Sequence, residues 1–118
     1  MKSLSVALSL SIIVSLPVQA AQNNNLRSPE PGVLCDRHVC ASGSEGISRV
    51  LTEKYLGKKV AARRFSQGDF DRTEFTFSNG IFCDTKEKLC RGDRYYGVDG
   101  KRSGTVSDKY TTLLFGPR

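Results

Sequence analysis

The fold class of this chain is decided by the stretch Thr73-Glu-Phe-Thr-Phe-Ser-Asn-Gly-Ile-Phe-Cys-Asp84. Apolar and polar residues alternate in its first half, which is typical of a half-buried β-strand. The Asn79-Gly80 pair that follows is the strongest short signal for a β-hairpin, because a type I′ turn needs positive φ at both central residues. We therefore expect antiparallel strands over 73–78 and 81–84, followed by a third strand over 89–96.

Helical spacing is found on both sides of this meander. Apolar residues recur at helical intervals over 47–56, where Ser48 is placed as an N-cap, and the pattern continues over 58–65. A third helix is expected near the C-terminus, behind either Thr105 or Ser107 as its cap. An antiparallel meander with helices before and after it predicts a small α+β domain.

The first twenty residues have the features of a secretory signal peptide. Lys2 supplies a positive n-region, an apolar run broken only by serines follows, and small residues end at Ala20. We predict cleavage after Ala20, a flexible polar leader over 21–31 and one domain over 32–118. The expected product is periplasmic or secreted, with no transmembrane segment after cleavage.

Four cysteines are the strongest constraint on what holds so small a domain together. An even number of cysteines in an exported chain points to two disulfides, for which Cys35, Cys40, Cys83 and Cys90 allow three connectivities. The alternative is a zinc site that adds His38. The four-residue spacing of the first pair suits a zinc knuckle, whereas the six-residue spacing of the second does not. We therefore favour disulfides and expect no metal.

The two cysteine pairs belong to similar segments, which indicates an internal repeat. Gly32-Val-Leu-Cys-Asp36 matches Gly80-Ile-Phe-Cys-Asp84, and each is followed by a short polar span and the second cysteine. Further on, Thr52-Glu-Lys-Tyr55 matches Ser107-Asp-Lys-Tyr110 in the same order. These matches predict an ancient duplication.

The repeat also bears on the disulfide connectivity. We expect two half-repeats, about 32–78 and 79–118, that share one core. If each half is the same unit, each closes its own loop, so the preferred pairs are Cys35–Cys40 and Cys83–Cys90. Short loops limit the stabilisation to about 2–2.5 kcal/mol for each bridge on the chain-entropy model.

The chain is basic, with 18 Lys and Arg residues against 12 Asp and Glu and a net charge of +6. A basic exported protein favours anionic partners other than nucleic acid, which lies in another compartment. Six residues form the candidate anion-binding set: Lys58, Lys59, Arg63 and Arg64 on the second helical stretch, and Lys101 and Arg102 in a later loop. The alternative is that these side chains only form solvated surface.

An acidic cluster precedes the first predicted strand of the meander. Asp69, Asp71 and Glu74 lie close together in the sequence, and glycoside hydrolysis uses a pair of carboxylates of this kind. The commoner role of such residues before a strand is a solvated turn, in which an aspartate accepts hydrogen bonds from nearby backbone amides. We therefore expect no catalytic residue, no cofactor and no enzymatic activity.

The sequence resembles a known family over about residues 32–116. The residues that carry the likeness are Gly80-Ile-Phe-Cys-Asp-Thr-Lys-Glu-Lys-Leu-Cys90, Asp93-Arg-Tyr-Tyr96, Gly100-Lys-Arg-Ser103, and Leu56-Gly57 after Thr-Glu-Lys-Tyr. They are similar to the YcgJ, or Fels-1 prophage protein-like, family of small exported enterobacterial proteins. The resemblance implies export and the four-cysteine frame. It implies no activity, and the prophage association suggests a role in host fitness or in the envelope.

Two functions follow as expectations. The first is a non-enzymatic periplasmic module that binds an anionic envelope component through the basic residues. The alternative is a protein inhibitor of a secreted hydrolase such as a lysozyme, because a small disulfide-closed domain can present a rigid loop. The positive charge speaks against this alternative, since most such lysozymes are basic as well.

Overall fold

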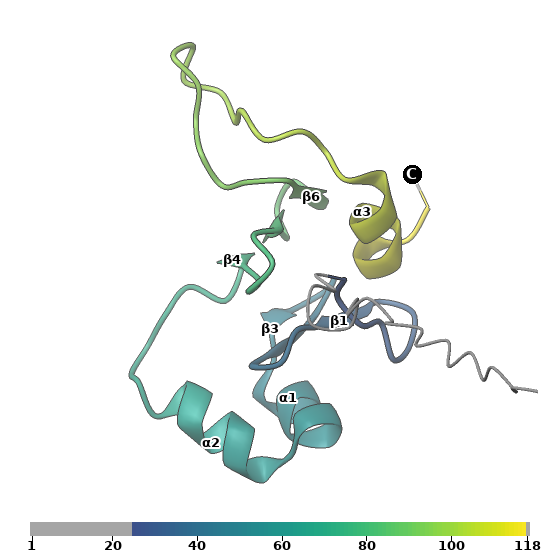
Figure 1. Cartoon of the computed structure of the whole chain (residues 1–118), viewed down its shortest axis with the longest axis vertical. Helices are drawn as coiled ribbons and strands as arrows, with labels where there is room; N and C mark the ends of the chain where they lie inside the picture. Colours follow the sequence, from purple (N-terminus) through teal and green to yellow (C-terminus); the bar gives the residue numbers. More distant parts are fainter. Residues whose placement is uncertain (1–24, 118) are drawn as a thin grey trace, which may run out of the picture.

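The structure is a computed structural model that describes residues 25–117, so the predicted signal peptide over 1–20 lies outside the described residues. The described part has two three-stranded antiparallel sheets and three α-helices, which confirms the α+β prediction (Figure 1). In chain order the elements are β1 Val33–Cys35, β2 Cys40–Ser42, β3 Gly46–Ile47, α1 Arg49–Leu56, α2 Lys58–Phe65, β4 Glu74–Thr76, β5 Phe82–Asp84, β6 Leu89–Arg91 and α3 Asp108–Phe115. None of the helices in this part is long and apolar enough to cross a membrane.

The predicted hairpin is present between β4 and β5, but the prediction of a type I′ turn is wrong. Only Gly80 of the Asn-Gly pair has positive φ, at 92°. The N–H of Gly80 donates to the carbonyl of Phe77 at 2.9 Å, and the N–H of Phe77 donates to the carbonyl of Ile81 at 2.8 Å. The connection is therefore a longer turn closed by one left-handed glycine, as in hairpin loops that end in a bulge. The pair marks the turn correctly, whereas the number of loop residues selects its type.

The first half contains its own antiparallel meander, β1-β2-β3, which was not predicted. Its short strands are buried almost throughout, so apolar and polar residues do not alternate in them. Its last strand lies close to the segment before β4, since the N–H of Ile47 donates to the carbonyl of Arg72 at 2.9 Å. Only glycine fits at position 46, because a Cβ there would lie 1.8 Å from that carbonyl oxygen. This contact brings the two sheets together.

Both disulfides have the predicted connectivity, Cys35–Cys40 and Cys83–Cys90, and no cysteine is free. Each joins directly opposed residues of neighbouring strands, β1 to β2 and β5 to β6. All four cysteines are fully buried, so the bridges are part of the core as well as covalent links. Such bridges are typical of proteins that fold in an oxidising compartment.

In the first half, the strand with the second cysteine is tied to the following helix by hydrogen bonds. The N–H of Cys40 donates to Oγ1 of Thr52 at 3.0 Å, and the carbonyl of Cys40 accepts from the N–H of Ser48 at 2.9 Å. Oγ of Ser48 then caps α1 by accepting from the N–H of Leu51. Because Thr52 is fully buried, its hydroxyl satisfies a backbone donor that water cannot reach.

The same arrangement recurs in the second half. The N–H of Cys90 donates to Oγ1 of Thr111 at 2.9 Å, and its carbonyl accepts from the N–H of Ser107 at 2.8 Å. Oγ of Ser107 caps α3 by accepting from the N–H of Tyr110, which decides between the two predicted caps. We call these two sets of bonds, centred on Thr52 and Thr111, the threonine clamps.

The clamps correct the register of the predicted repeat. The match of Thr52–Tyr55 with Ser107–Tyr110 is wrong by one helical turn, because Ser107 takes the place of Ser48 and Thr111 that of Thr52. The similarity of the two tetrapeptides led to the wrong register, because Thr52 inside the first helix was aligned with Ser107, the N-cap of the last helix. The duplication itself stays a prediction.

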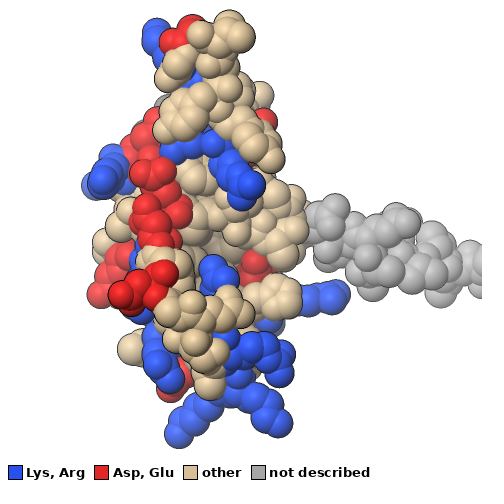
Figure 2. Space-filling model, turned by 90° about the vertical axis from the view of Figure 1, so that its left-hand side faces the viewer, with Lys and Arg blue, Asp and Glu red and all other residues tan. Residues whose placement is uncertain are grey.

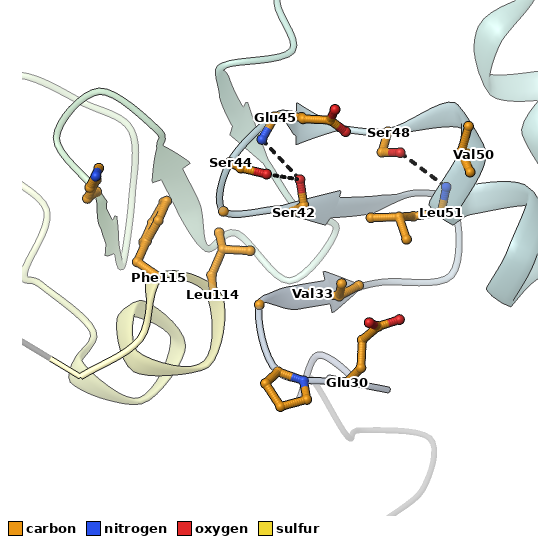
Figure 3. A pocket seen from close by; sticks show the side chains of 14 residues that line it. Glu30, Val33, Ser42, Ser44, Glu45, Ser48, Val50, Leu51, Leu114 and Phe115 are labelled. Atoms are coloured by element: carbon orange, nitrogen blue, oxygen red, sulfur yellow. Dashed lines mark hydrogen bonds between the residues drawn. The ribbon is translucent and has the colours of Figure 1, made fainter.

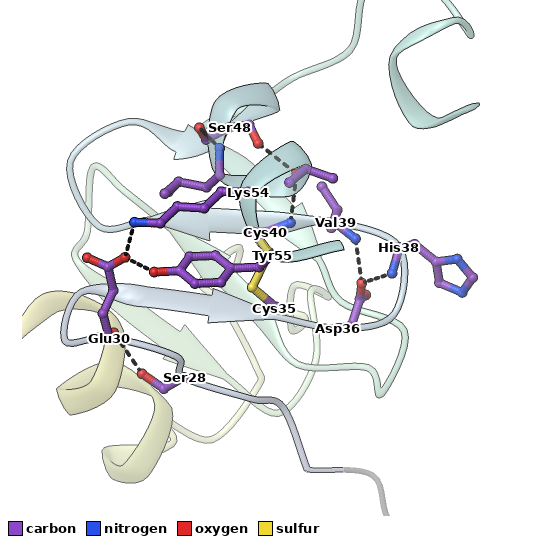
Figure 4. Close-up of a disulfide and its surroundings, with 12 residues drawn as sticks. Ser28, Glu30, Cys35, Asp36, His38, Val39, Cys40, Ser48, Lys54 and Tyr55 are labelled. Carbon is purple, nitrogen blue, oxygen red and sulfur yellow. Dashed lines mark hydrogen bonds and ion pairs between the residues drawn. A yellow bond between two sulfur atoms is a disulfide. The ribbon is translucent and has the colours of Figure 1, made fainter. Parts of the chain in front are cut away.

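The domain begins earlier than predicted. Leu26 is buried, and Arg27 pairs with Cys35 in an isolated bridge on the outer edge of β1. Further along, the Tyr55 hydroxyl of α1 donates to the Glu30 carboxylate (Figure 4), and this hydrogen bond is the main cause of a lowered pKa of Glu30. The predicted flexible leader over 21–31 is therefore wrong for its second half, which is attached to β1 and α1.

The two halves differ in the connection that follows their second strand. In the first half β2 reaches β3 through the short turn 43–45. In the second half the equivalent partner of β6 is Val106, which pairs with Arg91, and the chain between them, 92–105, forms a hairpin that projects from the body (Figure 1). The predicted strand over 89–96 therefore ends at Arg91 and continues as one side of this hairpin. The first half also differs because a further helix, α2, follows α1, whereas no further helix follows α3 in the described residues.

We expect Thr52→Val and Thr111→Val each to lower the free energy of unfolding by about 1–3 kcal/mol, because each leaves the buried N–H of a disulfide cysteine without an acceptor. Urea denaturation of the oxidised protein measures this. Thr112→Val, on the exposed face of α3, is the matched control and should change the value by less than about 0.5 kcal/mol. Equal effects at positions 111 and 112 would contradict the clamp.

Candidate functional site

A cleft of about 450 Å³ lies between α2, the start of β4 and the projecting hairpin. Its lining residues come from segments that are far apart in the sequence, and they are mainly arginines, aromatic residues and carboxylates: Arg64, Phe70, Asp71, Glu74, Phe75, Thr76, Phe82, Arg94, Tyr96 and Arg102. Figure 2 shows basic side chains gathered below the projecting hairpin and again over the helices, with acidic side chains along one margin between them. We call this site the arginine cleft.

Arg102 is the structural centre of the cleft. Its guanidinium carbon lies 4.3 Å from the ring centroid of Phe82 and 4.2 Å from that of Tyr96, so it contacts the rings of both residues. One of its terminal nitrogens donates to the carbonyl of Arg94 at 2.6 Å and the other to Glu74 at 2.9 Å. Only 11% of this side chain is exposed. These contacts fix the hairpin against β4 and β5.

The other two arginines make fewer contacts. The guanidinium of Arg64 lies over the ring of Phe70 at 4.6 Å, and its buried Nε has no hydrogen-bond partner among the described residues. Arg94 is exposed, and its guanidinium lies 5.5 Å from the ring of Tyr95. Arginine presents several donors in a planar fork that matches carboxylate and phosphate groups. These two side chains are therefore the ones available to an anion.

The carboxylates in the cleft are held by hydrogen bonds and an ion pair. Oδ1 of Asp71 accepts hydrogen bonds from the N–H and the hydroxyl of Thr73 and from the N–H of Glu74. The hydroxyl of Thr73, followed by these backbone donors, lowers the pKa of Asp71 below its ordinary value. Glu74 is half-buried and held by Arg102. The acidic cluster is therefore a turn, as predicted, but it also places two acceptors beside the arginines.

The structure brings only part of the predicted basic set to this cleft. Arg64 and Arg102 line it, whereas four residues do not: Lys58, Lys59, Arg63 and Lys101. Arg94 and Tyr96 were not predicted, because they lie in a run interpreted as the end of a strand. The two tyrosines directly before the glycine-containing turn 97–100 are the signal from which a hairpin at this place could be inferred.

A second, larger hollow of about 800 Å³ lies between β1, β2, α1 and the end of α3 (Figure 3). Its charged residues are Glu30, Glu45 and Lys88, so it does not favour anions. Its polar groups are already used, since Oγ of Ser42 accepts from the N–H of Glu45 and Oγ of Ser48 caps α1. This hollow lacks the converging donors of the arginine cleft.

The metal alternative has no support in the geometry. The cysteines are consumed by disulfides, and His38 is exposed in the loop between β1 and β2 (Figure 4). Asp36 of the same loop accepts hydrogen bonds from the N–H groups of His38 and Val39, so its carboxylate stabilises the turn. Within residues 25–117 no group of three or more His, Cys, Asp or Glu side chains is placed to hold a metal ion.

Comparison with known proteins connects the chain to one family. Residues 26–115 match the family model described as YcgJ protein. The chain is 57% identical over 90 residues to the uncharacterized protein YcgJ of Escherichia coli (strain K12), a match that covers 76% of this chain and 73% of that protein. No solved structure gives a significant match. The matched range begins at Leu26, which is also the first buried residue of the described part.

We expect Thr73→Val to raise the pKa of Asp71 toward its ordinary value, because the Thr73 hydroxyl is the largest cause of its lowering. In the native protein this carboxylate then stays ionised to lower pH than in the variant. Carbon-detected NMR titration of the Asp71 carboxyl group measures the shift. Thr76→Val is the control, since Thr76 lines the same cleft without donating to Asp71; an equal shift there would contradict the assignment.

Proposed function

Because the chain belongs to the YcgJ protein family, whose Escherichia coli relative is itself uncharacterized, we propose a function from its surface chemistry. We propose that it is a non-enzymatic binding module of the periplasm that binds an anionic component of the cell envelope in the arginine cleft. Two disulfides and the signal-like first twenty residues support export to an oxidising compartment.

The absence of an enzymatic role is inferred from how the reactive groups are used. The four cysteines are bridged, and the exposed His38 ring has no hydrogen bond to a nucleophile within the described residues. Asp71 is kept ionised, which suits an acceptor rather than a general acid. The other carboxylate of the cleft, Glu74, is held by the guanidinium of Arg102.

One observation carries the proposal: arginines from α2 and from both sides of the hairpin converge on one concave, aromatic-lined surface. Small-ligand sites are concave, are lined by hydrophobic and aromatic side chains, and hold a few placed polar groups. A basic outer surface would instead spread its charges over convex helices, as Lys58 and Lys59 do. The cleft therefore combines a positive charge that attracts an anion with a concave surface that can enclose it.

We expect the protein to sediment with lipopolysaccharide or with acidic liposomes at low salt and much less at high salt. Combined Arg64→Gln and Arg94→Gln should weaken this binding about tenfold or more, because both available guanidinium groups are lost. Arg102 is kept, since it also holds the hairpin.

The matched control is combined Lys58→Gln and Lys59→Gln, which removes the same charge from the outside of α2. It should weaken binding by less than about threefold, the effect of screened surface charge. Equal losses in both double variants would show that only net charge matters and would contradict the cleft. No salt-sensitive binding to either material would contradict the proposed function.

The projecting hairpin supports a second candidate function, inhibition of a secreted hydrolase such as a lysozyme. Gly97 and Lys101 pair across the tip at 2.7 Å, and Val98 between them is fully exposed. The side chain of Arg102 anchors the hairpin to β4 and β5. A preorganised loop with an apolar tip loses little entropy on entering the concave site of a partner.

We expect, on this second candidate, inhibition in turnover assays with one of several lysozyme classes. Val98→Ser should weaken inhibition about tenfold or more, because the apolar tip is lost. Val50→Ser is the control, since Val50 is exposed on α1, away from the hairpin. Uninhibited turnover by every class tested would contradict this function.

A further inference from the structure

We infer that the ligand of the arginine cleft is an acidic carbohydrate, a sugar ring that bears a carboxylate or a phosphate group. This inference rests on the proposed anion-binding function and specifies its ligand. It starts from a feature that simple anion binding does not explain: two carboxylates, Asp71 and Glu74, line the same cleft as three arginines.

The carboxylates set the first requirement on the ligand. A bare anion such as phosphate gains from Arg64 and Arg94 but is repelled by the charge of Asp71 a short distance away. Oδ1 of Asp71 is used by the turn, whereas its other oxygen accepts no hydrogen bond from the described residues. An ionised carboxylate is an acceptor only, so this oxygen needs a donor from the ligand. A sugar hydroxyl provides that donor.

The arginines set the second requirement. Arg102 already has partners for both terminal nitrogens, whereas the guanidinium groups of Arg64 and Arg94 have no carboxylate partner among the described residues. Two unpaired guanidinium groups at a concave surface favour one charged group on the ligand. A neutral sugar would leave this charge uncompensated, so the ligand has to combine hydroxyl groups with an anionic group.

The aromatic rings set the third requirement. The ring of Tyr96 is packed against Arg102, yet 61% of the residue remains exposed at the cleft. Phe70 also lines the cleft, under Arg64. Aromatic faces carry a partial negative charge and attract the C–H groups that cover one face of a sugar ring. A flexible aliphatic chain would use these rings less well than a rigid ring does.

The dimensions favour a carbohydrate over a membrane surface. A volume of about 450 Å³ lies in the range of sites for small ligands, which enclose much of the bound molecule. The acidic residues along the margin of this face weaken its attraction for a plane of anionic lipid headgroups (Figure 2). A single acidic sugar at the end of a glycan meets the arginines without bringing further charge against that margin.

The test is an NMR titration of the intact, oxidised domain with four probes: glucuronate, glucose 6-phosphate, glucose and inorganic phosphate. Both acidic sugars, or one of them, should shift the amide signals of residues 70–76 and 94–102 saturably. Glucose and inorganic phosphate should bind about tenfold more weakly, because each lacks one of the two kinds of group. The two acidic sugars distinguish carboxylate from phosphate as the charged group.

Asp71→Asn separates the acidic sugar from a simple anion. The neutral side chain retains an oxygen for Thr73 but loses the charge, so binding of the acidic sugar should weaken about three- to tenfold. Binding of inorganic phosphate should instead become stronger, because the repulsion is removed. Asp69→Asn removes the same charge outside the lining of the cleft and should change neither value by more than about twofold.

The outcomes distinguish this inference from the proposed function. Inorganic phosphate or acidic liposomes that bind as tightly as the acidic sugars would overturn the carbohydrate inference and leave anion binding intact. The same holds if Asp71→Asn strengthens binding of the sugar and the phosphate alike. If neither acidic sugar nor any other anion shifts the signals of the cleft, both are overturned. Glucose that binds as tightly as glucuronate would also overturn both, since the arginines would then contribute nothing.

Discussion

Each half of the domain depends on one hydrogen bond, from the N–H of a disulfide cysteine to the hydroxyl of a buried threonine. Cys40 and Cys90 lie in strands of three residues whose backbone groups are buried and need partners. The threonines in the first turn of α1 and α3 supply those partners at 3.0 and 2.9 Å. The bond joins three elements at one point: the covalent bridge, the sheet and the helix. A small domain with such short strands has few other ways to connect its layers.

The arginine cleft is formed by the parts that differ between the halves. The helix α2 and the segment after it have no counterpart behind α3 in the described chain, and the hairpin 92–105 replaces the turn 43–45 of the first half. The cleft lies between these two additions, and Arg102 joins the hairpin to β4 and β5. The repeated parts therefore form the scaffold, whereas the parts that are not repeated contribute most of the polar groups of the site.

Sequence reasoning reached the parts of this structure that depend on local chemistry. The meander β4-β5-β6, the three helices, the cap at Ser48 and the disulfide pairs follow from periodicity, capping residues and the repeat. The meander β1-β2-β3 was missed because its strands are buried almost throughout, so apolar and polar residues do not alternate in them. The turn at Asn79-Gly80 was assigned to the wrong type because turn type depends on loop length, which is set by the pairing register.

The candidate site was predictable only in part, for a different reason. Arg64 and Arg102 were selected for their charge, but nothing in the sequence indicates that they meet, since 37 residues separate them and the approach depends on packing against Phe82 and Tyr96. The same limit applies to the register of the repeat. Sequence similarity aligned the two tetrapeptides with each other. The equivalence of Ser48 and Ser107 is recognised only from the capping hydrogen bonds that they make.

The hairpin 92–105 leaves and rejoins the body at a bridged pair, Arg91 and Val106, so its two ends are held together whatever lies between them. Chain exchanged between these two points would not touch either clamp or either sulfur bridge. The sequence of this loop is thereby separated from the bonds that hold the frame, so the loop is a place where engineers can exchange or graft chain without disturbing the rest of the domain.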